Sequence, residues 1–212
     1  QKRVTNKITK KYFFKALHLK IIGALGVGFI YQFYYGGGNG SGDTFYYFYH
    51  SGIIWDALWD DSFSVAMKLI FGTNDYSPEV AHYAYQMAWY GDSHSYFIVR
   101  ILAFLDLFTL HTYSASACIF AFSSFTGVWA MYSVFYKRYP LLHKEFAIAC
   151  FFVPSLFFWG SGILKDTITF GALGWTTYAL FNLFVFRKKI ILNIFIFIFS
   201  VWISYSIKQY IA

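Results

Sequence analysis

The feature that most constrains this chain is a series of long apolar runs separated by short basic stretches. Several runs approach the roughly 20 residues that an α-helix needs to cross a membrane. Only 13% of the 212 residues are charged, whereas 58% are hydrophobic and 25% aromatic. Soluble domains are about 25% charged, and a soluble fold of this size has too little interior for so many aromatic rings. We therefore expect an all-α, multi-pass integral membrane protein.

The distribution of basic residues indicates which runs cross the membrane, because cytoplasmic loops carry an excess of Lys and Arg. Counting residues 94–113 as a span leaves nine Lys and Arg inside and eight outside, which is no bias. Placing 94–113 along the outer interface instead puts thirteen of the 17 inside and four outside. Arg100 and Asp106 also make this run a poor span, since a mid-membrane charge costs about 2.5–3.5 kcal/mol.

The resulting prediction is five spans, with the N-terminus cytoplasmic and the C-terminus outside. Residues 1–15 form a basic cytoplasmic lead-in, and residues 16–207 form a single membrane domain. We expect the lysines of the N-terminal stretch, up to Lys20, to extend toward the lipid headgroups. The large outer loop, residues 36–113, opens with a glycine run and carries short interfacial helices. The spans are expected near 16–35, 114–136, 145–162, 167–186 and 190–207.

Composition and spacing exclude several other classes of protein. The net charge of +7 does not indicate nucleic-acid binding, because the basic residues cluster at the ends of apolar runs. A transporter would carry ionisable residues in mid-span, and the predicted spans contain almost none. Cys118 and Cys150 lie within apolar runs, which favours buried hydrophobic side chains over a disulfide or metal site. No Cys or His pair has zinc-ligand spacing.

The segment 42–49, Gly-Asp-Thr-Phe-Tyr-Tyr-Phe-Tyr, is the first candidate for chemistry. Asp43 stands just past the first span, where a low dielectric raises the proton affinity of an unpaired carboxylate. Such a group suits a general base acting on a hydroxyl. The rings of Tyr46 and Tyr47 beside it suit stacking on a sugar face. The alternative is that Asp43 caps a helix beginning at Thr44, and spacing alone favours capping.

The second candidate runs from Pro154 through Gly160 and Gly162 to Lys165 and Asp166. The proline bends the end of one span, and the next span begins near Lys165 on the outer face. The free N–H groups and positive dipole end of a helix attract an anion there, and Lys165 adds a full charge that suits a lipid phosphate. The alternative, that Lys165 and Asp166 only cap the helix and lie at the interface, is equally well supported by the residues.

Two further polar features each have a structural and a functional interpretation. The adjacent carboxylates Asp60 and Asp61 can hold a divalent cation, but a solvated loop or helix cap is favoured. Arg100 can bind phosphate bidentately or pair with Asp106 or Asp92, and pairing is favoured.

Together the two candidate segments resemble the GT-C superfamily of integral membrane glycosyltransferases. Members carry an acidic residue in the first extracytoplasmic loop, where Asp43 stands with Tyr46 and Tyr47; the variant with two adjacent acids resembles Asp60-Asp61. The segment from Pro154 to Asp166 is similar to one that recurs in bacterial members. The resemblance covers residues 20–190, although only these stretches are specific, and members usually have more than five spans.

The resemblance implies an enzyme of the bacterial inner membrane that moves a sugar from a polyprenyl-phosphate donor by inverting transfer. Asp43 would be the base, Tyr46, Tyr47, Lys165, Asp166 and Arg100 would bind substrate, and no cofactor would be required, with a divalent cation as an option. The alternative is a non-enzymatic subunit or scaffold of a larger membrane complex. In both cases membrane lipids are partners, and other membrane subunits are potential ones.

Overall fold

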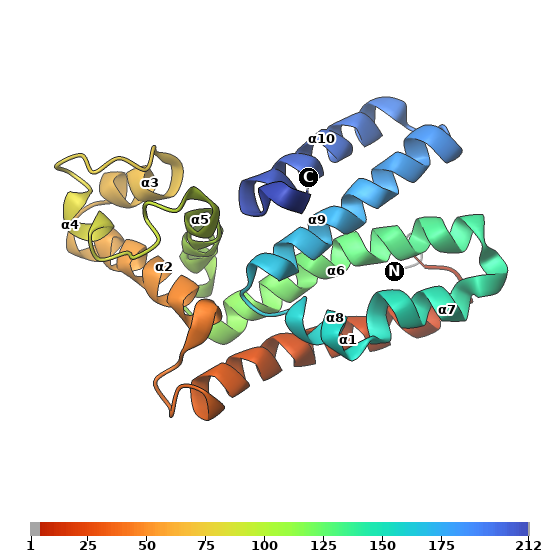
Figure 1. Cartoon of the computed structure of the whole chain (residues 1–212), viewed down its shortest axis with the longest axis horizontal. Helices are drawn as coiled ribbons and strands as arrows, with labels where there is room; N and C mark the ends of the chain where they lie inside the picture. Colours follow the sequence, from red (N-terminus) through yellow and green to blue (C-terminus); the bar gives the residue numbers. More distant parts are fainter. Residues whose placement is uncertain (1–4, 212) are drawn as a thin grey trace. The chain divides into compact units, whose positions relative to one another are not determined.

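The structure, a computed structural model, describes residues 5–211, and every regular element in that range is a helix (Figure 1). Lys2 and Arg3 of the predicted lead-in lie outside the described residues. The chain folds as two compact units. We call residues 1–27 with 118–212 the bundle unit, and residues 28–117 the loop unit. The predicted membrane domain, residues 16–207, contributes to both.

Within residues 5–211, four helices are long and apolar enough to cross a membrane by length and composition, as expected for a membrane protein. Their positions match four of the five predicted spans within a few residues. They are α1 (Lys10–Phe29) continued by the π-helix η1 (Ile30–Tyr34), α6 (Tyr113–Arg138), α9 (Lys165–Leu180) continued by η4 (Phe181–Val185), and α10 (Ile190–Ile207).

The remaining predicted span, 145–162, is not one helix. The chain passes through η2 (Pro140–Leu142), α7 (His143–Ala147), η3 (Ile148–Phe152) and α8 (Pro154–Trp159). The break falls at Val153, which is extended with φ −73° and ψ 120°. Proline lacks an N–H group and disfavours a helical conformation in the residue before it, so Pro154 ends one helix and starts another. The prediction of a continuous span was wrong for this reason.

Glycines bring α6 and α9 together within the bundle unit. A Cβ added to Gly127 would lie 1.9 Å from the Gly171 carbonyl oxygen, and one added to Gly171 would lie 2.8 Å from the Cα of Ser124. Small residues allow such close backbone approach between membrane helices. Further along, the rings of Phe135 and Phe181 are 5.4 Å apart. Because the contacts follow the same order along both helices, α6 and α9 run parallel.

The broken segment between them returns alongside α1. His143 lies 2.9 Å from the Tyr12 hydroxyl, and a Cβ on Gly162 would lie 2.8 Å from Val27. The segment therefore follows α1 in the same direction, from the level of residue 12 to that of residue 27. On the other side of α9, α10 packs antiparallel, with the Thr176 and Ser200 hydroxyls 2.9 Å apart (Figure 1).

The loop unit is itself helical, as predicted for the outer loop. It contains α2 (Gly42–Asp60), α3 (Phe63–Phe71), α4 (Ala81–Ala84) and α5 (Ser93–Thr109), and α2 packs against α5. The buried face of α5 includes Ile98, Val99 and Leu102, whereas Phe104 and Phe108 are 43% and 71% exposed. Residues 94–113 thus contain a helix, and α5 is not among the helices found able to span.

Candidate functional site

Asp43 lies in the first turn of α2, directly after the glycine turn that follows α1 and η1. Gly40 and Gly42 have φ values of 77° and 66°, which L side chains rarely adopt. Ser41, not Asp43, occupies the N-cap position, so the prediction that Asp43 caps a helix beginning at Thr44 was wrong. The Asp43 carboxylate is exposed and accepts no hydrogen bond from the part of the chain that the structure describes. The helix dipole favours a negative charge in this first turn.

The two tyrosines predicted beside Asp43 differ in accessibility. Tyr46 is 53% exposed and packs edge-on to Trp89, with ring centroids 5.7 Å apart. Tyr47 is 2% exposed and lies 4.5 Å from the same indole. Tyr46 therefore presents a ring to a ligand, but Tyr47 belongs to the core of the loop unit. The expectation that Tyr47 stacks on a substrate does not fit its burial.

A fully buried carboxylate, Asp106, lies at the centre of the loop unit. Its Oδ2 accepts hydrogen bonds from the Ser51 hydroxyl at 2.7 Å and from His111 Nδ1 at 2.9 Å. Its Oδ1 lies 3.2 Å from the Ser116 hydroxyl, which also contacts Thr109. Because a buried charge is tolerated only when it is hydrogen-bonded, this network explains how Asp106 remains in the interior. It joins α2, α5 and the first turn of α6.

The His111 ring is held in one orientation by its neighbours. It stacks on Phe48 at 4.1 Å, nearly parallel, and a Cβ on Gly52 would lie 2.9 Å from its Nε2. Leu110 and His111 have φ values of 52° and 49°, a strained conformation for residues other than glycine. A carboxylate only accepts hydrogen bonds, so Nδ1 carries the proton. Because stacking on Phe48 and the bond to Asp106 fix the ring within the loop unit, we assign the Asp106–His111 pair a structural role.

Arg100 pairs with neither of its predicted partners, Asp106 and Asp92, within the described chain. Its guanidinium donates to the carbonyl of Gly72 and, at 2.7 Å, to the side chain of Asn74. It also lies 5.0 Å from the centre of the Tyr96 ring. Arg100 therefore holds the chain after α3 against α5 through one terminal nitrogen, while its buried Nε has no hydrogen-bond partner within the described chain. This arrangement gives no support to phosphate binding by Arg100.

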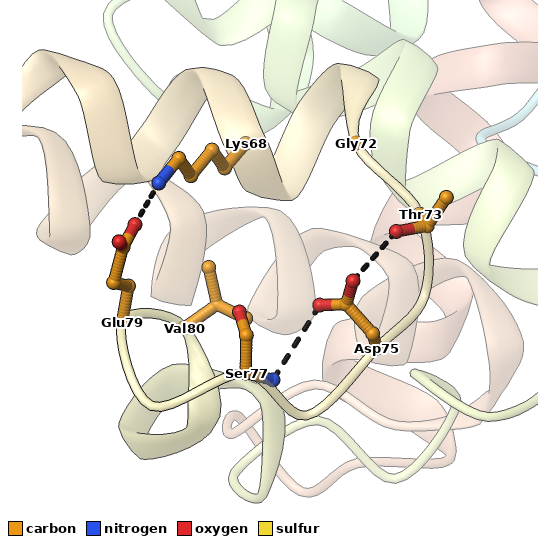
Figure 2. A pocket seen from close by; sticks show the side chains of 7 residues that line it. All are labelled: Lys68, Gly72, Thr73, Asp75, Ser77, Glu79 and Val80. Carbon is orange, nitrogen blue, oxygen red and sulfur yellow. Dashed lines mark hydrogen bonds and ion pairs between the residues drawn. The ribbon is translucent and has the colours of Figure 1, made fainter.

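Beside that chain segment lies a hollow of about 320 Å³, drawn in Figure 2. The side chains of Lys68 and Glu79 point toward each other across its mouth and form an ion pair. Asp75 accepts hydrogen bonds from the Thr73 hydroxyl at 2.7 Å and from the Ser77 N–H. The Thr73 bond is the largest of several effects that hold the pKa of Asp75 below its ordinary value. The polar groups here largely satisfy one another, and none was predicted to bind a ligand.

Lys165 and Asp166 open α9, as predicted, after Leu164 at the N-cap. Asp166 is exposed and forms an ion pair with Lys208, beyond the end of α10. A cavity of about 280 Å³ adjoins this helix start and is lined in part by Trp159, Gly160, Asp166 and Thr169. The bundle unit therefore places Asp166 at the edge of a cavity, although Asp166 already has a cationic partner.

Lys20 is a functional candidate that the sequence analysis missed. We expected it to extend to the headgroups, but it is 4% exposed within the 25-residue apolar helix Lys10–Tyr34. Its amino group donates to the Ser124 hydroxyl at 2.9 Å and to the Gly160 carbonyl. No carboxylate among residues 5–211 forms an ion pair with it. Lys20 thus fixes the Gly160 turn, which precedes α9, to both α1 and α6.

His50 is a second buried ionisable residue that the analysis did not single out. Its side chain is 5% exposed, and its Nδ1 has no hydrogen-bond partner within the described chain. Burial lowers the pKa of this imidazole. His50 packs edge-on to Trp89, the same indole that contacts Tyr46 and Tyr47.

The remaining candidates do not form a metal site. Asp60 and Asp61 are exposed at the C-terminal end of α2, in agreement with the favoured solvated interpretation. Residues 5–211 contain no group of three or more His, Cys, Asp or Glu placed to hold a metal ion. Cys118 and Cys150 are free thiols.

The predicted site residues are divided between the two units. Asp43, Tyr46, Tyr47 and Arg100 belong to the loop unit, whereas Lys165 and Asp166 belong to the bundle unit. Comparisons with protein-family models, with curated proteins and with solved structures gave no match.

Proposed function

We propose that this chain is a membrane glycosyltransferase that uses a polyprenyl-phosphate sugar donor, with Asp43 as its general base. The proposal rests on the exposure of the Asp43 carboxylate and on its lack of hydrogen bonds within residues 5–211. Asp43 is an exposed carboxylate, with no hydrogen bond from the described chain, in the first turn of a helix that follows a membrane-length apolar helix. Structural carboxylates are usually paired, as Asp106 is, and an unused one next to an exposed Tyr46 ring suits proton transfer from a sugar hydroxyl.

The proposed reaction assigns a role to each group. Asp43 takes the proton of the acceptor hydroxyl while that oxygen forms a bond to the anomeric carbon of the donor sugar. The bond from that carbon to the phosphate oxygen breaks, and the electron pair leaves with the lipid phosphate. Lys165 and the N-terminal N–H groups of α9 stabilise the negative charge on the leaving phosphate. The cavity beside Asp166 supports the presence of a ligand at this helix start.

The proposal includes five membrane crossings with a cytoplasmic N-terminus in a bacterial inner membrane. Because α6 and α9 run parallel, the chain between Arg138 and Lys165 must travel back along their length. The broken segment is therefore the fifth crossing, although it is not a continuous helix. Irregular backbone is tolerated at membrane depth when protein surrounds it, and here the Gly160 carbonyl is bound by Lys20.

A non-enzymatic subunit of a membrane complex is the second candidate, and α10 favours it. Residues Ile191, Phe195 and Ile198 are 86%, 67% and 61% exposed. Such a face contacts either lipid or the helix of another subunit. An assembly role predicts no chemistry at Asp43.

Replacement of Asp43 by asparagine separates the two candidates, because it removes the base and keeps the shape. We expect transfer from a panel of polyprenyl-phosphate hexoses, measured in proteoliposomes, to fall at least about 10²-fold. Asp56→Asn is the matched control, since Asp56 is also exposed on α2, and it should leave transfer unchanged. Full transfer by Asp43→Asn would refute the assignment of the base. Absence of transfer by the native chain from every donor would refute the enzyme and favour the subunit.

A further inference from the structure

One face of α6 in the bundle unit carries a row of small residues, and the row ends at a lysine. Thr126, Ala130, Ser133 and Lys137 follow one another at intervals of four, three and four residues, so they lie on the same side of the helix. Small side chains in such a row leave a groove along the helix surface. The charged residue stands at the end of that row, near the C-terminus of α6 at Arg138.

Aromatic side chains form the walls of this groove. The groove has a volume of about 550 Å³. Its walls comprise Phe122, Phe125 and Trp129 of α6, Trp175 and Tyr178 of α9, and Phe13 of α1. Two of its polar side chains are already bonded, since the Trp175 indole donates to Thr126 at 3.1 Å and the Ser133 hydroxyl donates to the Trp129 carbonyl. An alkyl chain therefore fits this surface better than a polar ligand does.

The end of the groove carries two neighbouring positive charges. The Lys137 ammonium lies 3.7 Å from the centre of the Phe186 ring, and Lys188 follows Phe186 by two residues. Neither lysine forms an ion pair with a described carboxylate. Two adjacent ammonium groups repel each other unless an anion lies between them. The position beside a membrane-length helix makes a lipid phosphate the available anion.

We propose that this groove is a binding site for an anionic phospholipid. One acyl chain lies over Ala130 between the aromatic walls, and the phosphate contacts Lys137 and Lys188. The charge pair favours a lipid over a neighbouring protein helix, which would need a carboxylate at the same point. The proposal is independent of sugar transfer, since it involves neither Asp43 nor Lys165.

Trp129 and Trp175 allow the site to be tested by fluorescence quenching when the other five of the seven tryptophans are replaced by phenylalanine in every chain compared. The full chain is placed in phosphatidylcholine nanodiscs with a minor fraction of either chain-brominated phosphatidylglycerol or chain-brominated phosphatidylcholine. We expect the brominated phosphatidylglycerol to quench more strongly at equal fraction. Lys137→Gln with Lys188→Gln should weaken its apparent affinity about tenfold, as expected for lost charge-assisted contacts. Ala130→Leu, which fills the groove, should also reduce the quenching.

The control variant Lys144→Gln with Lys189→Gln removes the same net charge from exposed positions outside the groove. It should retain the preference for phosphatidylglycerol. Equal quenching by the two lipids in the native chain would overturn the proposal. An equal loss of affinity in both double variants would also overturn it, because general surface charge would then explain the preference. Protection of the two tryptophans from both lipids would show that protein covers the groove. The lysine variants leave the packed core unchanged, so they remain decisive if Ala130→Leu does not fold.

Discussion

At the scale of single residues, the buried Asp, Lys and His side chains within residues 5–211 have three different environments. Asp106 is stabilised by hydroxyl groups and an imidazole. Lys20 is stabilised by a hydroxyl and a backbone carbonyl. His50 has an unpartnered Nδ1 within the described chain and packs against Trp89. Burial lowers the pKa of His50, which favours the neutral form of its imidazole in the folded protein.

The environment of His50 predicts a pH dependence of stability. An unfolded imidazole takes up a proton near its ordinary pKa of 6.5, whereas burial lowers the pKa in the folded protein. Between the two values the unfolded state binds more protons, so stability falls as the pH drops below about 6.5. We expect His50→Gln to reduce this pH dependence, measured as the thermal unfolding midpoint of the purified protein at about pH 7.5 and pH 5.5.

His82→Gln is the control for this measurement, because His82 is exposed on α4. The control should keep the slope of the native chain. If His50→Gln and His82→Gln have the same slope as the native chain, burial of His50 does not govern the pH response.

The partners of these buried residues explain why the sequence did not reveal them. Ser51 is 55 residues from Asp106, and Ser124 and Gly160 are 104 and 140 residues from Lys20. No local pattern relates such positions. Lys20 stands in a basic stretch, so its charge indicated a headgroup position, and only the packing of α6 against α1 shows otherwise. By contrast, the position of Asp43 after a glycine run was visible in the sequence because turn and helix start are adjacent.

At the scale of helices, the hydrophobic runs predicted where the long helices lie better than they predicted whether each helix is continuous. The predicted span 190–207 coincides with α10, and 114–136 lies within α6. The boundaries follow from the basic residues and turns at the ends of each run. The break at Val153 was not predicted, since Pro154 was expected to bend a span without dividing it. The residue before a proline avoids the helical region, and that local rule prevailed over the apolar pattern.

The structure gives a different reason for the predicted interfacial position of α5. Arg100 and Asp106 made residues 94–113 a poor span, yet both side chains are turned into the loop unit. The outward face instead carries Phe104 and Phe108, whose rings contact each other, and Phe104 also contacts Phe71 of α3. An apolar face of this kind is typical of a helix lying in a membrane interface, so the proposed position of α5 now rests on its aromatic face.

The glycine contact between α6 and α9 gives a prediction at this scale. A Cβ on Gly127 would lie 1.9 Å from a backbone oxygen, so Gly127→Ala must force the helices apart. We expect a loss of stability of about 1–3 kcal/mol or more from such overpacking. The measurement is the unfolding midpoint in detergent micelles, compared with that of the native chain.

Gly26→Ala is the matched control, because its added Cβ would make an ordinary contact of 3.6 Å with the Phe158 ring. Alanine favours a helix over glycine by about 1 kcal/mol, so this variant should be at least as stable as the native chain. Destabilisation of equal size by both variants would show that close packing at Gly127 is not the cause.

At the scale of the whole molecule, two independent observations support the proposed path across the membrane. The first is the distribution of charge. With the buried Lys20 set aside, twelve Lys and Arg remain on the predicted cytoplasmic side against four outside. The second is the parallel packing of α6 and α9, which requires the chain between them to return. Both agree with the proposed five crossings, a path in which Asp43 and Arg138 face opposite sides of the membrane.

Accessibility of single cysteines tests this arrangement most directly. The background is a chain with Cys118 and Cys150 replaced by alanine, into which Asp43→Cys or Arg138→Cys is introduced. The label is a membrane-impermeant maleimide added to intact cells, with permeabilised cells as the reference for full labelling. The account predicts that the position 43 cysteine is labelled in intact cells and that the position 138 cysteine is labelled only after permeabilisation. Labelling of position 138 but not of position 43 in intact cells would contradict it.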